Sequence, residues 1–270
     1  MRVVSLLPSA TELLCSIPGG ADLLVGRSHE CDWPPQIQHL PVLTAQRTTA
    51  TDSAAIDAQV RATLEGNDSL YILDHNTLAE LKPDLIITQD LCHVCSIDLP
   101  AVQQVAAALP NRPEVLSLNP QTLEEVFDDL LRIGAACNLA AEAQQTVVNL
   151  RARWWSARDH VNQLVSGPVT LLLEWMDPLF IAGHWTPELI EQAGGRHVLN
   201  EPGAASTTIE PDTLVAAAPE RLIIAPCGYD LSAIERELST LTEASWWSQL
   251  PAVQTGHVAL VDGSAWFNRP

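Results

Sequence analysis

The chain has 270 residues, 47% of them hydrophobic, which is enough for a large core at a length where one core usually gives way to two. Its 33 acidic residues against 14 basic ones give a formal net charge of −19, which argues against a nucleic-acid partner because such binding needs clustered Lys and Arg. No apolar run approaches the roughly 18 residues that a transmembrane helix needs, so we expect no membrane-spanning segment.

The chain opens with a short apolar strand that turns directly into a helix. The strand is expected at residues 3–6, Pro8 ends it, and a helix follows at 11–17 with Ser9 or Thr11 as its N-cap. Such a βα unit directs free backbone N–H groups toward one spot. Because Met1 leads straight into the strand, we expect no secretion leader and a cytoplasmic protein, or a periplasmic one if a leader has been removed.

Strand and helix patterns alternate along the rest of the chain, which is typical of βα units and parallel sheets. In the first half we expect strands at residues 23–26, 85–88 and 114–118, a helix at 99–109, and an inserted helical stretch at 53–64 followed by a turn at Gly66 and a short run at 71–73. In the second half we expect strands at 169–174, 222–224 and 258–261 and helices at 187–193 and 231–238.

The helical period persists longest over residues 123–165. It predicts either one long helix or two abutting ones, with Gly134 and Asn138 as the residues that would break or bend it. We therefore divide the chain into an N-terminal lobe at 1–122, a stiff connecting helix at 123–165 and a C-terminal lobe at 166–270. The predicted fold class is α/β, with two Rossmann-like lobes that each contain a central parallel sheet.

The unusual side chains lie in loops that follow the predicted strands. Ligands of open parallel sheets bind beyond the carboxyl ends of the strands, so two facing lobes would form one cleft lined by these loops. The candidate ligand-binding residues in the loops are Ser9, His29, Trp33, Asp90, His93, Trp175, His184, Trp185, Tyr229, Trp266 and Phe267.

A Cys and His cluster forms a second candidate site. Cys92, His93 and Cys95 lie in one loop, with His29 and Cys31 in a neighbouring one, and thiolates with imidazole are the ligand set of zinc or iron–sulfur sites. A single CxxC motif is weak evidence alone, so the favoured interpretation is partly buried thiols with a His that stabilises its loop. A metal site or a redox-active pair is the alternative, and we expect the protein to fold without metal. Three further cysteines, Cys15, Cys137 and Cys227, are expected to be core thiols.

Aromatic side chains surround a histidine in the second half of the chain. Trp175, Phe180 and Trp185 bracket His184 just before a predicted helix, and flat side chains beside a wide cleft suit a large planar ligand. His184 would then bind the ligand or its metal. The alternative is that Trp175 and Phe180 pack between strand and helix.

Enzyme motifs are absent from the sequence. It contains no GxSxG, P-loop, GxGxxG or HExxH pattern, and Asp90 and Asp177 are the only acidic residues expected near the cleft. We therefore predict no catalytic residues.

Six segments carry a resemblance to a known family: VVSLLPSATELL at residues 3–14, GRSHECDWPP at 26–35, ELKPDLIITQD at 80–90, PLFIAGHWTPELIEQAGG at 178–195, APERLIIAPCG at 218–228 and WSQLPAVQTGHVALVDGSAWFNRP at 247–270. Together they resemble the cobalamin- and iron-siderophore-binding family of ABC-transporter substrate-binding proteins, most of all its vitamin B12-binding branch. The inserted stretch at 53–73, the CHVC motif at 92–95 and the expected lack of a leader set this chain apart as a leaderless subgroup.

The resemblance implies a class III periplasmic-binding-protein fold, in which a rigid helix joins two α/β lobes that hold a corrinoid. The aromatic wall of the site would be Trp33, Trp185, Trp266 and Phe267. The resemblance also implies an ABC permease as partner, which acidic residues of each lobe would contact.

Three functions follow from these observations. The first is non-catalytic binding of cobalamin or a related corrinoid for uptake or intracellular carriage, with His29, His93 or His184 as possible cobalt ligands. The second is binding of haem, an iron chelate or a bare metal ion through Cys31, Cys92, Cys95 and His29. The third is a cytoplasmic enzyme that processes a corrinoid or another tetrapyrrole, with the CxxC motif as a redox pair.

Overall fold

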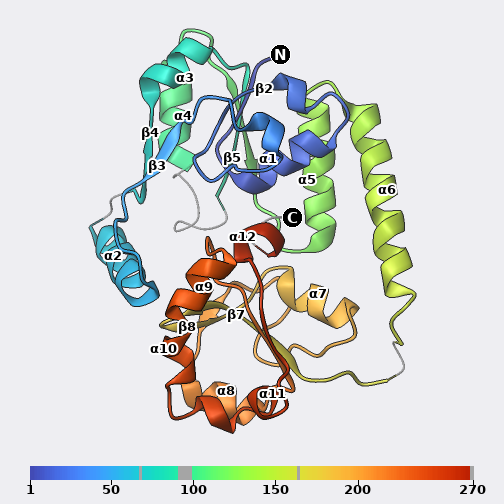
Figure 1. Ribbon diagram of the computed structural model, residues 1–270. Coiled ribbons are helices and arrows are strands. Elements are labelled where there is room, and N and C mark those ends of the chain that lie inside the picture. The colour runs from blue at the N-terminus through green and yellow to red at the C-terminus, as the bar shows by residue number, and fades with distance from the viewer. Residues whose placement is uncertain (67–68, 91–98, 163–164, 268–270) are drawn as a thin grey trace. The chain divides into compact units, whose positions relative to one another are not determined.

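The computed structural model describes residues 1–66, 69–90, 99–162 and 165–267 (Figure 1). The chain forms two compact units, and each consists of segments that are separate in the sequence. Unit 1 contains Met1–Ala50, Ala58–Pro120 and Glu124–Arg151, and unit 2 contains Thr51–Asp57, Gln121–Leu123 and Ala152–Pro270. The α/β class is confirmed. The predicted lobe boundaries remain a prediction.

The centre of unit 1 is a sheet in the order β2-β1-β5-β6, in which every neighbouring pair is parallel. Its strands are β1 (Val3–Ser5), β2 (Leu24–Arg27), β5 (Leu85–Gln89) and β6 (Glu114–Leu118). All four lie within one or two residues of their predicted positions. The runs of consecutive buried residues in β1 and β5 are typical of parallel strands that are covered on both faces.

Helices cover both faces of this sheet (Figure 1). On one face, Val4 and Ile86 pack with Leu78 of α3 and with Val102 and Ala106 of α4. Side chains alternate between faces along a strand, so Val3 and Leu85 point to the other side. The helices around this sheet include α1 (Pro8–Ser16), α3 (His75–Leu81), α4 (Leu99–Ala108) and α5 (Leu123–Ala136).

The predicted N-cap of the first helix is wrong. Helix α1 begins at Pro8, and its N-cap is Leu7, which makes no side-chain capping bond. Proline suits the first turn because the N–H that it lacks would have no partner inside the helix. Ser9 and Thr11 lie inside the helix, where the Thr11 hydroxyl donates to the carbonyl of Leu7 at 3.1 Å.

The inserted stretch of the first half forms a helix and a small separate sheet. Helix α2 (Ser53–Glu65) and strand β4 (Tyr71–Leu73) are confirmed at their predicted positions. Strand β4 pairs antiparallel with β3 (Thr44–Gln46), which the sequence pattern did not reveal because it is only three residues long.

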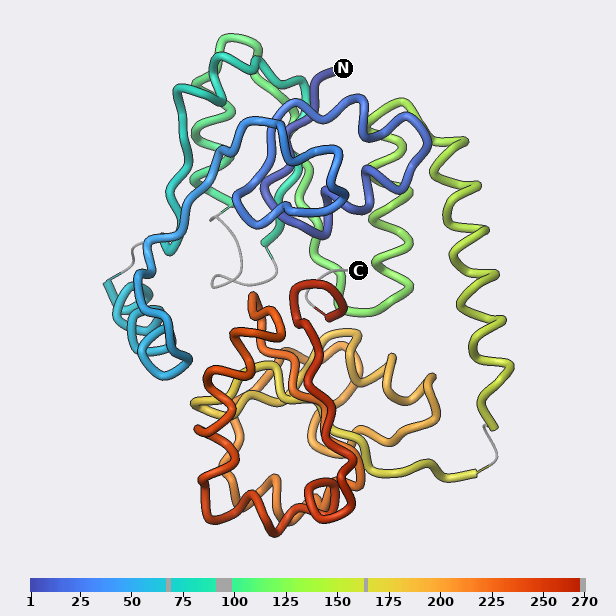
Figure 2. Tube along the Cα trace, in the orientation of Figure 1, coloured from blue at the N-terminus to red at the C-terminus, as the bar shows by residue number. Residues whose placement is uncertain are grey.

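The long helical stretch forms two helices rather than one. Helix α5 ends at Ala136 and α6 (Ala140–Arg158) follows, and Figure 2 shows the two running in opposite directions through a short connection. Asn138 has a positive φ of 58°, which ends the first helix at one of the two predicted positions. Gly134, the other, lies inside α5 and does not break it.

The centre of unit 2 is a mixed sheet in the order β11-β10-β7-β8-β9. The predicted strands β7 (Thr170–Met176), β10 (Arg221–Ile224) and β11 (Val258–Leu260) form its parallel part. Two antiparallel strands, β8 (Leu179–Ile181) and β9 (Thr207–Thr208), extend it at one edge. They are too short to give a periodic signal in the sequence.

The two faces of this sheet are covered differently. One face buries Leu171, Leu173 and Leu222 against several short helices, and the other buries Leu172 against α7 (Thr186–Gln192). The short helices are α8 (Pro211–Ala217), α9 (Leu231–Glu237), α10 (Ser239–Thr242) and α11 (Pro251–Gln254). A further short helix, α12 (Gly263–Trp266), follows the last strand.

The structure tests the predicted burial of three cysteines and the expectation about membrane-spanning segments. Cys137 is buried and Cys15 is half-buried, but Cys227 is exposed, so its placement in the core is wrong. It follows β10 in a loop, where the chain turns outward beside Gly228. Within the described ranges, no helix is both long and apolar enough to cross a membrane.

Close packing of α5 against α6 generates the first prediction. A Cβ atom added at Gly134 would lie 2.2 Å from the Cβ of Ala143, so we expect Gly134→Ala to lower the free energy of unfolding by about 1–3 kcal/mol. Urea unfolding measures the loss. The double variant Gly134→Ala/Ala143→Gly should recover most of it, and equal loss in both variants would contradict this account.

A buried carboxylate in α5 generates the second prediction. Asp129 is 3% exposed, Arg132 donates to its Oδ1 at 2.6 Å, and its Oδ2 has no hydrogen-bond partner among the described residues. Burial raises the pKa of Asp129 above its ordinary value, and Arg132 only partly opposes this effect. The carboxyl group of Asp129 therefore keeps its proton to a higher pH in the folded state than in the unfolded state. The free energy of unfolding falls as the pH rises from the unfolded-state pKa through the folded-state pKa.

We expect the free energy of unfolding of the wild type, relative to Asp129→Asn, to decrease as the pH rises from about 4 to 7. Chemical unfolding at several pH values measures this difference. Asp128→Asn is the matched control, because Asp128 is the exposed neighbour in the same helix. An equal pH dependence in the two variants would contradict the assignment.

Candidate ligand-binding residues in the two units

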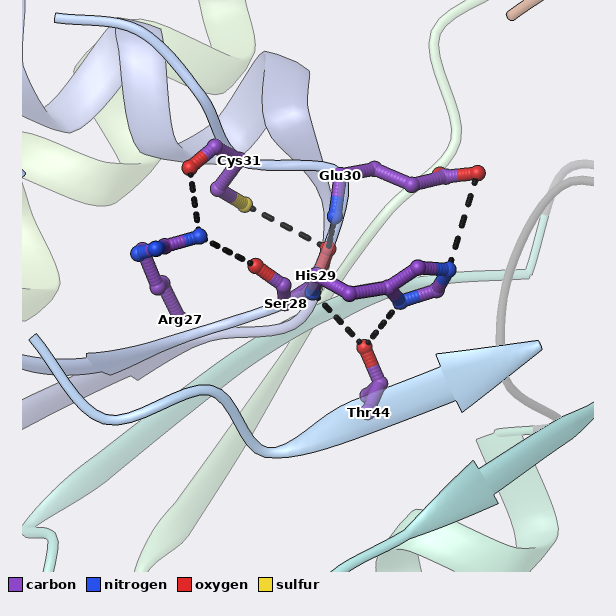
Figure 3. Close-up of polar contacts among 6 residues, drawn as sticks. All are labelled: Arg27, Ser28, His29, Glu30, Cys31 and Thr44. Atoms are coloured by element: carbon purple, nitrogen blue, oxygen red, sulfur yellow. Dashed lines mark hydrogen bonds and ion pairs between the residues drawn. The ribbon is translucent and has the colours of Figure 1, made fainter. Parts of the chain in front are cut away.

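The loop after β2 in unit 1 is held by the side chain of Arg27 (Figure 3). Its guanidinium donates from Nη1 to the carbonyls of Ser28 and Cys31, at 3.2 and 2.9 Å, and from Nη2 to the carbonyl of Gln38 at 3.0 Å. These bonds satisfy carbonyl groups that no strand or helix pairs. The loop therefore has a defined conformation despite its lack of regular structure.

His29 projects from this loop and is oriented by Thr44 of β3. The Thr44 hydroxyl accepts the backbone N–H of His29 at 3.1 Å and lies 2.8 Å from Nδ1 of the ring (Figure 3). The ring is 5.9 Å from that of Tyr71, and Nε2 lies 4.0 Å from a carboxylate oxygen of Glu30. Burial lowers the pKa of His29 below its ordinary value, so the imidazole is neutral at neutral pH.

Cys31 is held in the same loop as a neutral thiol. It is fully buried, and its Sγ lies 3.0 Å from Thr11 Oγ1 and 3.5 Å from Ser28 Oγ. Burial raises its pKa, which opposes the thiolate that a metal would need. Cys92, His93 and Cys95 lie outside the described residues. Among the residues that are described, no group of three or more His, Cys, Asp or Glu side chains could hold a metal ion.

The other described candidate residues of unit 1 are Ser9, Trp33 and Asp90, which follow β1, β2 and β5 in the chain. Ser9 is half-buried in the first turn of α1. Trp33 is 56% exposed, and Asp90 is exposed while its backbone N–H donates to Asn119 Oδ1 at 2.6 Å. Trp33 lies in the loop that follows β2, where its exposed indole is a candidate contact for a ligand.

His184 and Trp185 lie between β8 and α7 in unit 2, in a tightly held loop. His184 has a positive φ of 53°, its N–H donates to the carbonyl of Ala204 at 2.6 Å, and its carbonyl accepts from Gly203 at 2.8 Å. A Cβ atom at Gly183 would lie 2.4 Å from the backbone nitrogen of Ser206, so only glycine fits there.

The side chains of His184 and Trp185 are half-buried, and their rings lie 6.1 Å apart. Burial lowers the pKa of His184, so its imidazole is also neutral at neutral pH. A strained backbone that is held by its surroundings often marks a functional position. The carboxyl-end rule for parallel strands does not place His184, however, because β8 runs antiparallel.

Trp266 and Phe267 follow the last strand of unit 2. Trp266 lies at the end of α12, whose N-terminus Asp262 caps by accepting the N–H of Ala265 at 2.9 Å. Its side chain is 70% exposed, whereas Phe267 packs partly against the core cluster beside α7. Of these two aromatic side chains, only that of Trp266 is therefore largely open to solvent.

Trp175 and Tyr229 contact each other inside unit 2. Their rings meet edge to face at 5.4 Å, and Tyr229 is only 7% exposed. The Tyr229 hydroxyl donates to Glu237 Oε1 at 2.7 Å, and burial, together with that carboxylate, raises its pKa. Trp175 Nε1 donates to the carbonyls of Asp177 and Ser53, at 3.1 and 3.2 Å.

Three residues that orient these side chains were not found from the sequence: Thr44, Ser53 and Glu237. Thr44 lies 15 positions from His29, Ser53 lies 122 from Trp175 and Glu237 lies 8 from Tyr229. Nothing in the local pattern of any of the three distinguishes it from an ordinary surface residue. Only the tertiary structure brings them to the candidate residues.

Comparisons with known proteins agree on the fold. A family model described as "Periplasmic binding protein" matches residues 3–265, and no curated protein matches the chain. The periplasmic vitamin B12-binding protein BtuF of Vibrio cholerae is similar in structure, with a TM-score of 0.69 and 19% identity over 100% of this chain and 90% of that one.

Two haem-binding structures are similar to the same degree. The periplasmic heme-binding protein RhuT from Roseiflexus sp. RS-1 has a TM-score of 0.72 and 20% identity over 97% of this chain and 89% of that one. The periplasmic heme-binding protein HutB of Vibrio cholerae has a TM-score of 0.69 and 17% identity over 100% of this chain and 92% of that one. At these identities the likeness establishes the fold alone.

The contact between His29 and Thr44 generates the third prediction. The Thr44 hydroxyl can donate to Nδ1 while it accepts the backbone N–H of His29, and a carboxylate oxygen of Glu30 lies 4.0 Å from Nε2, so we expect the ring proton on Nε2. We expect the ¹⁵N spectrum of the imidazole to show the Nε2–H tautomer and a pKa below the ordinary value. Thr44→Val should mix the two tautomers and Thr44→Ser should not. A mixture already present in the wild type would contradict this assignment.

Proposed function

The chain belongs to the periplasmic binding protein family, whose members are non-catalytic substrate-binding proteins, and from this premise we propose that it binds cobalamin or a related corrinoid. The ligand would be taken up through an ABC permease or carried inside the cell.

The observation that carries this proposal is the set of exposed or half-buried aromatic and histidine side chains in each unit. In unit 1, Trp33 is 56% exposed and lies in the same ordered loop as His29. In unit 2, Trp266 is 70% exposed and His184 stands beside Trp185 in a strained loop. Flat aromatic surfaces of this size suit a large planar ligand, because each stacked ring adds stabilisation beyond the area that it buries.

The histidines support a ligand that contains a metal. Burial keeps both His29 and His184 neutral at neutral pH, and the neutral imidazole is the form that coordinates cobalt or iron. Thr44 orients the imidazole of His29, and the 203–204 backbone holds the backbone of His184. His184 could therefore act as an axial ligand, whereas His29, whose Nδ1 faces Thr44, would present its Nε2–H as a hydrogen-bond donor.

Haem or another iron chelate is the second candidate. Solved structures of the same fold include haem-binding proteins as well as a vitamin B12-binding protein, and both ligands are metallated tetrapyrroles with a broad flat face. The same aromatic and histidine side chains would serve either ligand. The Cys and His cluster with Cys31, Cys92 and Cys95 would favour an iron ligand or a bare metal ion.

The fourth prediction separates the two ligands. We expect cyanocobalamin to quench tryptophan fluorescence in a saturable titration, and haemin to bind at least about tenfold more weakly under the same conditions. Trp185→Ala and Trp33→Ala should each weaken binding about tenfold, since each removes a stacking surface.

Trp155→Ala is the matched control for these variants. Trp155 is a 49% exposed indole on α6, outside the candidate loops, so its removal should leave the affinity unchanged. Tighter binding of haemin than of cyanocobalamin would select the second candidate. A saturable response to neither ligand would refute both.

A further inference from the structure

A seven-residue segment of the first half of the chain is built into unit 2. Residues 51–57, which we call the arm, belong to unit 2, although the residues on either side of them, up to Ala50 and from Ala58, belong to unit 1. The arm contains the start of α2. It lies within the stretch that has no counterpart among the segments resembling the binding-protein family.

Ser53 carries the polar contacts of the arm. It is 2% exposed, its N–H donates to Glu237 Oε2 at 2.8 Å, and its carbonyl accepts from Trp175 Nε1 at 3.2 Å. Ile56, one turn further along α2, packs against the core cluster of unit 2. The arm is therefore attached by the backbone N–H and C=O of one residue, Ser53, and by the side chain of Ile56.

Glu237 joins the arm to the aromatic pair of unit 2. One of its oxygens accepts from Ser53 and the other accepts the hydroxyl of Tyr229 at 2.7 Å. The ring of Tyr229 contacts the ring of Trp175 edge to face, and Trp175 Nε1 donates to the carbonyl of Ser53. A carboxylate beside the first N–H groups of a helix is also favoured by the helix dipole.

The start of α2 can form without this contact. Asp52 caps the helix itself, because its side chain accepts the N–H of Ala55 and its carbonyl accepts the N–H of Ile56, both at 2.9 Å. Loss of the bond to Glu237 would therefore release the arm while α2 still forms, but the first turn of α2, held only by the caps of Asp52, would open more often. Trp175 would keep its bond to the carbonyl of Asp177 but lose the second acceptor that orients its indole.

We propose that the arm is a releasable strap on unit 2, that Glu237 holds it closed, and that the closed strap positions the indole of Trp175. Its consequence for ligand binding rests on the proposed function, in which Trp175 is one of the expected contact residues. Glu237 and Ser53 are then positioning residues, which act through Trp175.

The fifth prediction uses two independent variants of this contact. Glu237→Gln removes the carboxylate charge, and Ser53→Pro removes the N–H at the first position of the helix, where proline is tolerated. We expect hydrogen exchange of the amides of residues 54–57 to become about tenfold faster in each, because a charge-assisted hydrogen bond is lost. The indole ¹H–¹⁵N resonance of Trp175, assigned through its absence in Trp175→Phe, should shift in both.

Matched controls separate the contact from a general effect on folding. Ser53→Ala keeps the N–H, and Glu235→Gln changes an exposed carboxylate on the same helix, so neither should change exchange in the arm. Circular dichroism verifies that unit 2 is folded in every variant. Unchanged arm exchange in both Glu237→Gln and Ser53→Pro, or wild-type arm amides that exchange as fast as an unstructured peptide, would overturn the proposal.

Titration of the same proteins with cyanocobalamin distinguishes this proposal from the proposed function. If the strap positions Trp175 for the ligand, Glu237→Gln and Ser53→Pro should weaken binding several-fold and their controls should not. Faster arm exchange together with unchanged affinity would overturn the positioning role. Faster exchange in a protein whose wild type binds neither cyanocobalamin nor haemin would refute the proposed function and leave the strap itself standing.

Discussion

Parallel pairing of short apolar strands is the constraint on which the rest of the structure depends. In unit 1 the central strand β1 pairs with β2 and β5, and in unit 2 the central strand β10 pairs with β7 and β11, all in parallel. Such strands cannot be joined by tight turns, so a helix or a long connection must follow each one. These connections cover the two faces of each sheet and leave the loops to carry the unusual side chains.

The loops are held by single polar groups that bond several backbone carbonyls. Arg27 does this after β2. Asn200 does so beside His184, where its Nδ2 donates to the carbonyls of Ala205 at 2.9 Å and Ala182 at 3.2 Å. An unpaired buried carbonyl is costly, so these bonds select one loop conformation. The candidate histidines are consequently presented by ordered backbone.

The family assignment and the ligand rest on different kinds of observation. The match over residues 3–265 establishes the family, and it agrees with segments that run from the first strand to the last. Structures of this fold carry different ligands at similar levels of identity, so the fold does not choose among them. In the proposed function that choice would depend on a few side chains, among them Trp33, Trp185 and the two neutral histidines.

The amino-acid sequence by itself determined the α/β class, the family resemblance and nearly every parallel strand, because runs such as residues 85–88 and 222–224 are buried on both faces wherever they pair. It also located the helix in the insertion and the break near Asn138, since local propensity governs both. Strands β3, β8 and β9 were missed, and β3 and β9 are largely exposed and contain no apolar run that would mark them. Only the tertiary structure decided the start of α1 at Pro8, the exposure of Cys227, and the contacts of Thr44 with His29 and of Glu237 with Ser53. The last two contacts join residues 15 and 184 positions apart, and no local pattern can encode a partner at such a distance.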